Sequence, residues 1–245
     1  MKWVVLLLVA FLAGCQTIDR GSFVYFDRSM VNKEHGYQVV DDPTGSAPTP
    51  KVERFEVRAG DCGRNQTWDD CKNDRERSEL KQEGSSEYPG SSAWYGWSIY
   101  IPKDYASLSP TKTNLGQFHQ RGSHVVWMFH ESNGSYYLDE QTSGYTNNYI
   151  LLIPRSELKG KWHQIEVNVG WSRNSDGFFK VWVNGEQKAN YTGRTITANE
   201  AIFRYGIYRS FISRYISRYG NPVPTQIVYY SNIRRASTRD GLASQ

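Results

Sequence analysis

The sequence lacks several features that point to common classes of protein. It shows no long helical periodicity and no alternation of strands with helices, which argues against an α/β fold with a parallel sheet. The formal net charge is only +4, too small to indicate a nucleic-acid partner. The histidines have no metal-ligand spacing, so no cofactor is predicted, although a structural calcium ion in a loop stays open. These histidines are His35, His119, His124, His130 and His163.

Short strand-like runs separated by turns occupy the chain instead. Residues 94–101 and 162–169 alternate apolar and polar side chains, and 174–177 and Asn184-Gly185 are turn sequences. Only residues 155–158 and 210–219 could be helical. We therefore expect one all-β domain over residues 16–245, folded as a two-sheet antiparallel β-sandwich of the jelly-roll type.

The N-terminus reads as an export signal. A short positive start, Met1-Lys2, precedes an apolar run too short to span a bilayer. Leu12-Ala13-Gly14-Cys15 resembles the bacterial lipoprotein processing box, so residues 1–15 are predicted to be the signal peptide with its lipidated Cys15. Gln16 rather than Asp favours the outer membrane, on its periplasmic or its cell-surface side. The alternative is an ordinary signal peptide with a chance cysteine.

Only Cys62 and Cys71 remain for a disulfide after Cys15 is lipidated. Export places this pair in an oxidising compartment, where a disulfide closing the short, turn-rich segment would brace the backbone before Arg75. A two-cysteine metal site is the alternative, but no further histidine or cysteine lies nearby. We predict the disulfide.

A densely charged segment follows the second cysteine, at residues 74–81. If it is a strand, one face presents three cations around one carboxylate. That face carries Arg75, Arg77, Glu79 and Lys81, and the other carries Glu76, Ser78 and Leu80. Such a face suits an anionic polymer, and a solvated edge strand is the alternative.

Two further segments repeat this alternation of polar residues. One carries Gln117 and His119 and the other carries Arg204, Gly206, Tyr208 and Ser210. If the three strands line one concave sheet, Arg, Gln, His and Tyr meet in a substrate groove. Each also has a plain alternative, such as an edge strand for Gln117, a core position for Tyr208 and a surface ion pair for Arg77 with Glu79.

That set of side chains suits β-elimination on a uronic acid polymer. The difficult step removes the proton at C5, beside the C6 carboxylate. Arginine and an amide can neutralise this carboxylate. Histidine or tyrosine can take the proton, and tyrosine can protonate the departing O4. A nearby arginine is expected to lower the pKa of that tyrosine.

Three motifs resemble the signature strands of jelly-roll polysaccharide lyases. They are Arg77-Ser78-Glu79-Leu80, Gln117-Phe118-His119 and Tyr205-Gly206-Ile207-Tyr208. The chain departs from the alginate lyase pattern at Lys81, Arg204 and Ser210. The segment from Gly60 to Leu80 is more similar to the heparin lyase I-like and glucuronan lyase-like group. Matches at residues 96–102 and 228–234 extend the resemblance over most of the mature chain.

The resemblance implies that Arg77 and Gln117 contact the uronate carboxylate. It also implies His119 and Tyr208 as base and acid, in an order that the sequence leaves open. The predicted substrate-binding residues are Arg75, Glu79, Arg204 and Arg209. Glu79 is expected to hold Arg77 in position. For Arg75, the sequence leaves open whether it contacts substrate or solvent. Arg214 and Arg218 could serve a sulfated substrate, but a solvated loop is the favoured interpretation for both.

The predicted function is a polysaccharide lyase acting on an anionic, uronate-containing polymer. The protein is expected to be a monomer that meets the membrane only through its lipid. The alternative is a non-catalytic carbohydrate-binding lipoprotein of the same fold. A glycoside hydrolase is disfavoured because the Glu-x-Asp-x-x-Glu pattern of laminarinase-like jelly rolls is absent.

Overall fold

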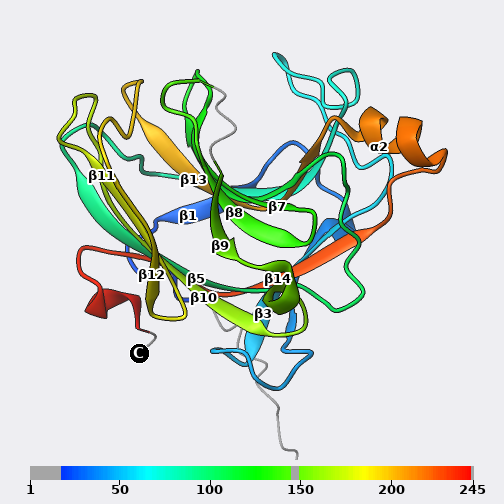
Figure 1. Cartoon of the computed structure of the whole chain (residues 1–245), viewed down its shortest axis with the longest axis horizontal. Coiled ribbons are helices and arrows are strands. Elements are labelled where there is room, and N and C mark those ends of the chain that lie inside the picture. The colour runs from blue at the N-terminus through cyan, green and yellow to red at the C-terminus, as the bar shows by residue number, and fades with distance from the viewer. Residues whose placement is uncertain (1–17, 145–148, 244–245) are drawn as a thin grey trace, which may run out of the picture.

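Two seven-stranded sheets pack face to face in the computed structural model, which describes residues 18–144 and 149–243 (Figure 1). The first sheet, called the site sheet, has the order β1 (Tyr25–Arg28), β4 (Arg75–Glu83), β13 (Ala201–Ser210), β6 (Thr113–Gln120), β7 (Val125–Ser132), β8 (Ser135–Glu140) and β9 (Tyr149–Ile153). The second has the order β12 (Glu186–Thr192), β11 (Phe178–Val183), β10 (Trp162–Gly170), β5 (Ser92–Tyr100), β14 (Gln226–Ala236), β3 (Lys51–Val57) and β2 (Tyr37–Asp41). The predicted all-β antiparallel sandwich is confirmed.

Helices are few and short, as the sequence predicted. They are α1 (Arg155–Leu158), α2 (Ile212–Tyr219), and the 3-10 turns η1 (Glu34–Gly36) and η2 (Asp240–Leu242). Within the described residues no helix is long and apolar enough to cross a membrane. The predicted lipidation site, Cys15, lies outside the described residues.

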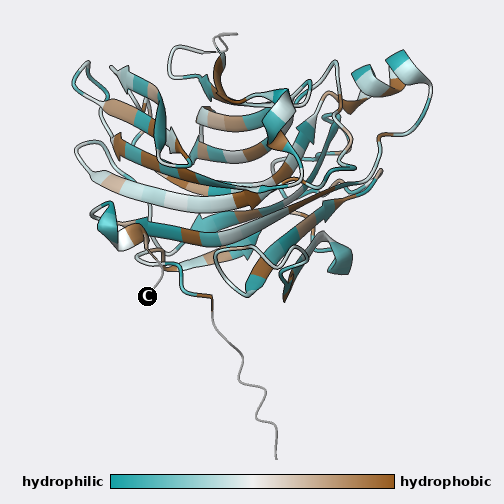
Figure 2. Ribbon diagram, turned by 60° about the horizontal axis from the view of Figure 1, so that its bottom comes forward, coloured by the Kyte–Doolittle hydropathy of each residue, from teal (hydrophilic) through white to brown (hydrophobic). Residues whose placement is uncertain are grey.

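Aromatic side chains fill the space between the sheets. Trp127 stacks on Phe179 with ring centroids 3.9 Å apart, and Trp97 meets Phe129 edge-on at 5.0 Å. Both contacts join a strand of the site sheet to one of the second sheet. Apolar bands along the strands are visible in Figure 2. Buried aromatic rings carry large apolar areas, and their preferred edge and stacked geometries fix how the sheets face each other.

Tight hairpins set the register on both sheets. Asn133-Gly134 and Asn184-Gly185 adopt positive φ angles of 51° and 84°, and of 50° and 83°. Consecutive positive φ angles define the turn that matches strand twist, and Asn-Gly is the pair that adopts it at least cost. The Asn184-Gly185 turn was predicted above from the sequence.

The charged strand is not at an edge of its sheet. β4 lies between β1 and β13, and β6 lies between β13 and β7, so the edge-strand alternatives for both segments are wrong. Leu80 belongs to the core between the sheets. β4 therefore has one face in the core and its Arg77 face on the outside of the sandwich.

A glycine marks an irregularity in β13. The register to β6 shifts between Tyr205 and Tyr208, and Gly206 within this shift has φ of 122°. A Cβ atom on Gly206 would lie 2.4 Å from the carbonyl oxygen of Ser78 and 2.8 Å from the ring of Phe55. Neither the backbone angle nor the space accommodates a side chain.

Gly206→Ala is predicted to lower the free energy of unfolding by more than about 1 kcal/mol, because alanine is strained at this φ and clashes with backbone. Denaturant unfolding measures it. The control is Gly116→Ala on β6, whose φ is not in the positive region and whose Cβ would meet Phe129 at an ordinary 3.7 Å. Equal losses in both variants would contradict this account.

Candidate active site

The three predicted segments lie on adjacent strands of the site sheet. β13 is paired with β4 on one side and β6 on the other. Tyr208 lies opposite Arg77 on β4, and Arg204 lies opposite Gln117 on β6. Residues directly opposite each other in a sheet project from the same face. The structure thus brings together residues as far apart in the sequence as Arg75 and Tyr208, which are 133 positions apart.

A buried ion network occupies the centre of this face. Arg77 forms a two-pronged contact with Asp70, from Nε to Oδ2 at 2.7 Å and from Nη2 to Oδ1 at 2.6 Å. Its Nη1 donates to Glu79 at 3.1 Å, and Glu79 in turn accepts a bond of 2.7 Å from Nε2 of Gln117. Glu79 therefore positions both Arg77 and Gln117, in the role predicted for it toward Arg77.

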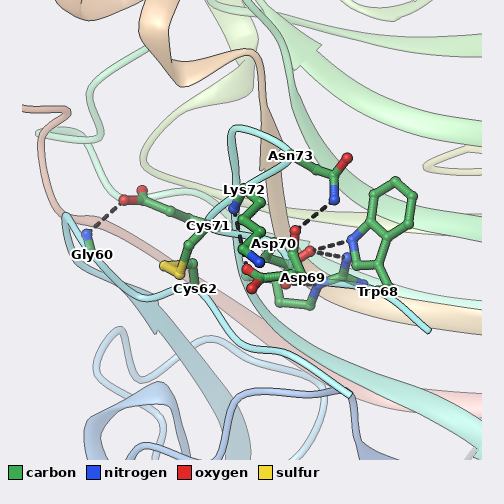
Figure 3. Close-up of a disulfide and its surroundings, with 10 residues drawn as sticks. Gly60, Cys62, Trp68, Asp69, Asp70, Cys71, Lys72 and Asn73 are labelled. Atoms are coloured by element: carbon green, nitrogen blue, oxygen red, sulfur yellow. Dashed lines mark hydrogen bonds and ion pairs between the residues drawn. A yellow bond between two sulfur atoms is a disulfide. The ribbon is translucent and has the colours of Figure 1, made fainter. Parts of the chain in front are cut away.

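The cysteine loop supplies the aspartate of this network (Figure 3). Cys62 and Cys71 form the predicted disulfide, with Cα atoms 5.2 Å apart. Asp70 directly precedes Cys71, and Trp68 donates its indole N–H to Asp70 Oδ1 at 2.8 Å. The sequence predicted the brace but missed Asp70. The sequence feature that could have indicated Asp70 is an acidic residue inside a disulfide-closed loop, directly before an arginine-rich strand.

Burial and charge compete at these groups. Burial lowers the pKa of Arg77, but the charges of Glu79 and Asp70 outweigh it and hold that pKa above its usual value. Burial raises the pKa of Glu79, opposed by the charges of Arg77 and Arg204. Arg77 is therefore a permanent cation whose charge is already matched inside the protein.

Arg204 differs from Arg77 because it lacks a salt bridge within the part of the chain that the structure describes. Its Nε is buried with no hydrogen-bond partner there. Burial, together with the nearby cations Arg77 and Arg121, lowers its pKa, while Glu79 and Tyr208 raise it. A desolvated guanidinium without a paired anion is well suited to receive a carboxylate.

His119 presents one ring nitrogen as a proton acceptor. Its Nδ1 lies 2.8 Å from the carbonyl oxygen of Gln120, so Nδ1 carries the hydrogen and Nε2 keeps its lone pair. Burial, and the charge of Arg204 next, lower the pKa of His119 to about 3. The imidazole is therefore neutral at physiological pH.

Tyr208 lies between two arginines. Nε of Arg75 donates to its hydroxyl oxygen at 3.1 Å, and the guanidinium of Arg77 stands over its ring at 4.4 Å. The pKa of Tyr208 is nevertheless raised, because burial outweighs the opposing effect of both cations. The expectation of a lowered pKa is wrong, and the hydroxyl keeps its proton at neutral pH.

Arg209 does not belong to this face, so its assignment to the substrate was wrong. It is fully buried, where its Nε donates to Glu76 and its Nη1 to the carbonyl of Pro224, each at 2.6 Å. The reason is the two-residue period of a strand. If Tyr208 faces outward, Arg209 must face the other sheet.

Sequence reasoning also missed two residues in the row of Tyr208. Asn114 lies opposite Tyr208, and His130 lies opposite Asn114 on β7. Nδ2 of Asn114 and both ring nitrogens of His130 are buried without hydrogen-bond partners among the described residues. A register shift between Asn114 and Gly116 breaks the period that would have linked Asn114 to Gln117. The amide of Asn114 is thus a further donor beside the tyrosine.

The proton acceptor and the tyrosine lie at the two ends of this cluster. His119 is opposite Ile202, whereas Tyr208 is opposite Asn114, so Arg204 and Gly206 lie between them on β13. Five residues of strand β6 correspond to about 16 Å between backbone positions. One sugar ring reaches both groups only if their side chains lean toward Arg204.

No metal centre accompanies these side chains in the described ranges. No group of three or more histidine, cysteine, aspartate or glutamate residues is arranged there to hold an ion. A cavity of about 570 Å³ lies elsewhere, between Arg20, Phe26 and Tyr37, and contains none of the site residues named above.

A family model described as polysaccharide lyase matches residues 18–234. The chain belongs to the polysaccharide lyase family. The match covers β4, β6 and β13, the strands that carry the predicted site. Among curated proteins, no sequence matches the chain.

Solved structures show how widely the fold is shared. An endo-β-1,4-glucuronan lyase from the fungus Trichoderma reesei is 16% identical, with a TM-score of 0.62 over 89% of this chain and 96% of its own. An alginate lyase of polysaccharide lyase family 7 is 13% identical, with a TM-score of 0.58 over 84% of this chain and 83% of its own. A GH131 β-glucanase catalytic domain from Podospora anserina is 12% identical, with a TM-score of 0.56 over 88% and 85%. At these identities the likeness concerns the fold.

Asp70→Ala is predicted to cost about 3–5 kcal/mol of unfolding free energy, because it leaves the buried Arg77 with half of its counter-charge. Denaturant unfolding measures the loss. The matched control is Asp69→Ala, whose carboxylate accepts an exposed hydrogen bond from the backbone N–H of Lys72. A loss at Asp70 as small as that at Asp69 would show that the network does not depend on this pairing.

Proposed function

We propose that this polysaccharide lyase cleaves a uronate-containing anionic polysaccharide by β-elimination, with glucuronan or a related 4-linked polyuronate as substrate. One observation carries the proposal. Arg204, a desolvated arginine that forms no salt bridge with any described residue, lies on one sheet face between a neutral histidine and a protonated tyrosine. Those are the three charge states that elimination beside a carboxylate requires.

Arg204 is the first candidate to bind the uronate carboxylate. It replaces Arg77 in this role because Asp70 and Glu79 already occupy the guanidinium of Arg77. Arg77 and Gln117 would add positive potential and an amide donor from the same face. Neutralising the carboxylate stabilises the negative charge that develops when the adjacent C5–H bond breaks.

The proton transfers then follow from the charge states. Nε2 of His119 takes the C5 proton, and the electron pair of that bond forms the C4–C5 double bond. The C4–O4 bond breaks, and the hydroxyl of Tyr208 gives its proton to O4. The products are an unsaturated uronate and a new chain end, and no water is consumed.

Location and assembly complete the proposal. An exported lipoprotein attached through Cys15 to the outer membrane, acting as a monomer, would meet such a polymer outside the cytoplasm.

A non-catalytic binding lipoprotein is the second candidate, favoured by exposed aromatic residues on and beside the site sheet, such as Phe211 and Tyr149.

The deciding experiment offers the purified protein glucuronan, alginate, polygalacturonate and glycosaminoglycans, and follows unsaturated uronate by ultraviolet absorbance. We expect absorbance to rise on at least one 4-linked polyuronate. Binding without absorbance on every polymer would replace the lyase with the binding protein.

Tyr208→Phe and His119→Ala are each predicted to reduce kcat at least about 100-fold, the usual size of a general acid–base contribution. Tyr100→Phe on the second sheet and His124→Ala in the exposed turn before β7 are the controls and should retain turnover. Full activity in His119→Ala, with loss in Tyr208→Phe, would mean that Tyr208 makes both proton transfers and that His119 lies too far along the sheet to reach the same sugar ring. Full activity in both would refute the assignment.

The pH profile of kcat/KM is predicted to be flat across the neutral range. The base works only when neutral, and the pKa of free His119 is about 3, so activity falls only as the pH drops toward that value. The acid works only when protonated, and the pKa of Tyr208 is raised above its ordinary value of about 10, so the basic limb lies above it. An acidic limb near pH 6.5 that disappears in His119→Ala would contradict the burial of His119.

A further inference from the structure

Helix α2 projects from the sandwich directly after the strand of the site tyrosine (Figure 1). β13 ends at Ser210 and α2 begins at Ile212, and none of the residues of the helix is buried. Arg214 and Arg218 lie one turn apart on it, both exposed. The helix therefore adds no buried residue to the core of the fold.

The helix is nevertheless held in a defined position. The backbone N–H of Phe211 donates to the carbonyl of Asp74 at 2.9 Å. Ser213 donates its N–H and its hydroxyl to the carboxylate of Asp74, at 2.9 and 2.6 Å. Asp74 directly precedes β4, so the start of α2 is attached to the same strand that carries Arg75 and Arg77.

An alternating stack of cations and rings joins the helix to the site. The guanidinium of Arg75 lies 4.0 Å from the ring centre of Phe211, and that of Arg214 lies 4.4 Å from the same ring. Arg75 also donates to the hydroxyl of Tyr208. Tyr208, Arg75, Phe211 and Arg214 thus form one continuous line of contacts from the site onto the helix.

The helix surface combines positive charge with exposed rings. Arg218 stands 5.5 Å from the ring centre of Tyr219, which packs against Tyr215 at 4.7 Å. Arg214 and Arg218 form no salt bridge within the described residues, and α2 carries no acidic residue in its first turn. Guanidinium groups pair with carboxylates, and aromatic faces stack on sugar rings.

We propose that α2 extends the substrate site and binds uronate residues that lie beyond the cleavage position, through Arg214 and Arg218. The inference rests on the proposed function and deepens it, since it adds a dependence on chain length. A basic, aromatic helix on a lipid-anchored protein also suits an anionic membrane surface. The polysaccharide is favoured because the line of contacts leads from the helix to Tyr208.

The test compares Arg214→Ala/Arg218→Ala with the control Lys161→Ala/Lys188→Ala. The control removes the same charge from two exposed ion pairs beside the second sheet. Loss of two exposed ionic contacts should raise KM for polymeric glucuronan or alginate about fivefold to tenfold with little change in kcat, and the effect should shrink as the substrate is shortened to a trisaccharide. The control should match the wild type.

Binding separates this inference from the proposed function. Affinity electrophoresis in glucuronan or alginate, on the Tyr208→Phe background, reports the helix contribution even if no polymer is cleaved. Weaker binding in the Arg214/Arg218 variant alone supports the inference. Equal retardation of variant and control overturns it. So does loss of binding to phosphatidylglycerol vesicles while polysaccharide binding persists, since the helix would then be a membrane contact.

Discussion

The buried pairing of Arg77 with Asp70 and Glu79 is the interaction on which the site depends. Removing a guanidinium from water costs several kcal/mol unless anions replace the lost hydration. Asp70 and Glu79 supply those anions, from a loop and from the same strand. Because Asp70 must be held within bonding distance, the loop that bears it must be rigid, which gives the Cys62–Cys71 disulfide its structural purpose. Glu79 then has one oxygen left to position Gln117.

This network is the reason why the proposed carboxylate-binding residue is Arg204 rather than Arg77, the residue that the sequence predicted. A guanidinium that already meets two carboxylates adds potential but has few donors to offer. Arg204 lies on the next strand, desolvated and without such partners in the described chain. The two arginines therefore differ in what they can bind. Arg77 is bound by Asp70 and Glu79 inside the protein, whereas the guanidinium of Arg204 still has donors for a ligand.

The sequence predicted the fold class and the disulfide, because each depends on local signals, whereas the adjacency of the three strands came only from the structure. Alternation reports the two faces of a strand, and Asn-Gly reports a hairpin. Applied strictly, the same alternation would have excluded Arg209, which faces inward beside Tyr208. Asn114 and Asp70 were missed for another reason. A register shift hides the first, and the second lies in a loop whose path only tertiary structure reveals. The direction of the pKa shift of Tyr208 depends on how strongly burial opposes the nearby arginines, and a sequence pattern does not show how deeply a side chain is buried.

The fold alone does not choose the reaction, since both lyases and a β-glucanase share it. Hydrolysis of a glycosidic bond needs two carboxyl groups free to act on either side of it. Near Tyr208, Asp70 and Glu79 are instead bound to Arg77, and further along the sheet Asp139 is paired with Lys112. A carboxylate that serves as a counter-ion to a buried cation cannot give up that charge without destabilising the network. Lys81, opposite Arg204, is likewise paired with Glu83. The described groups near Arg204 that exchange protons outside an ion pair therefore include an imidazole and a phenol, a pair that suits elimination beside a bound carboxylate better than hydrolysis.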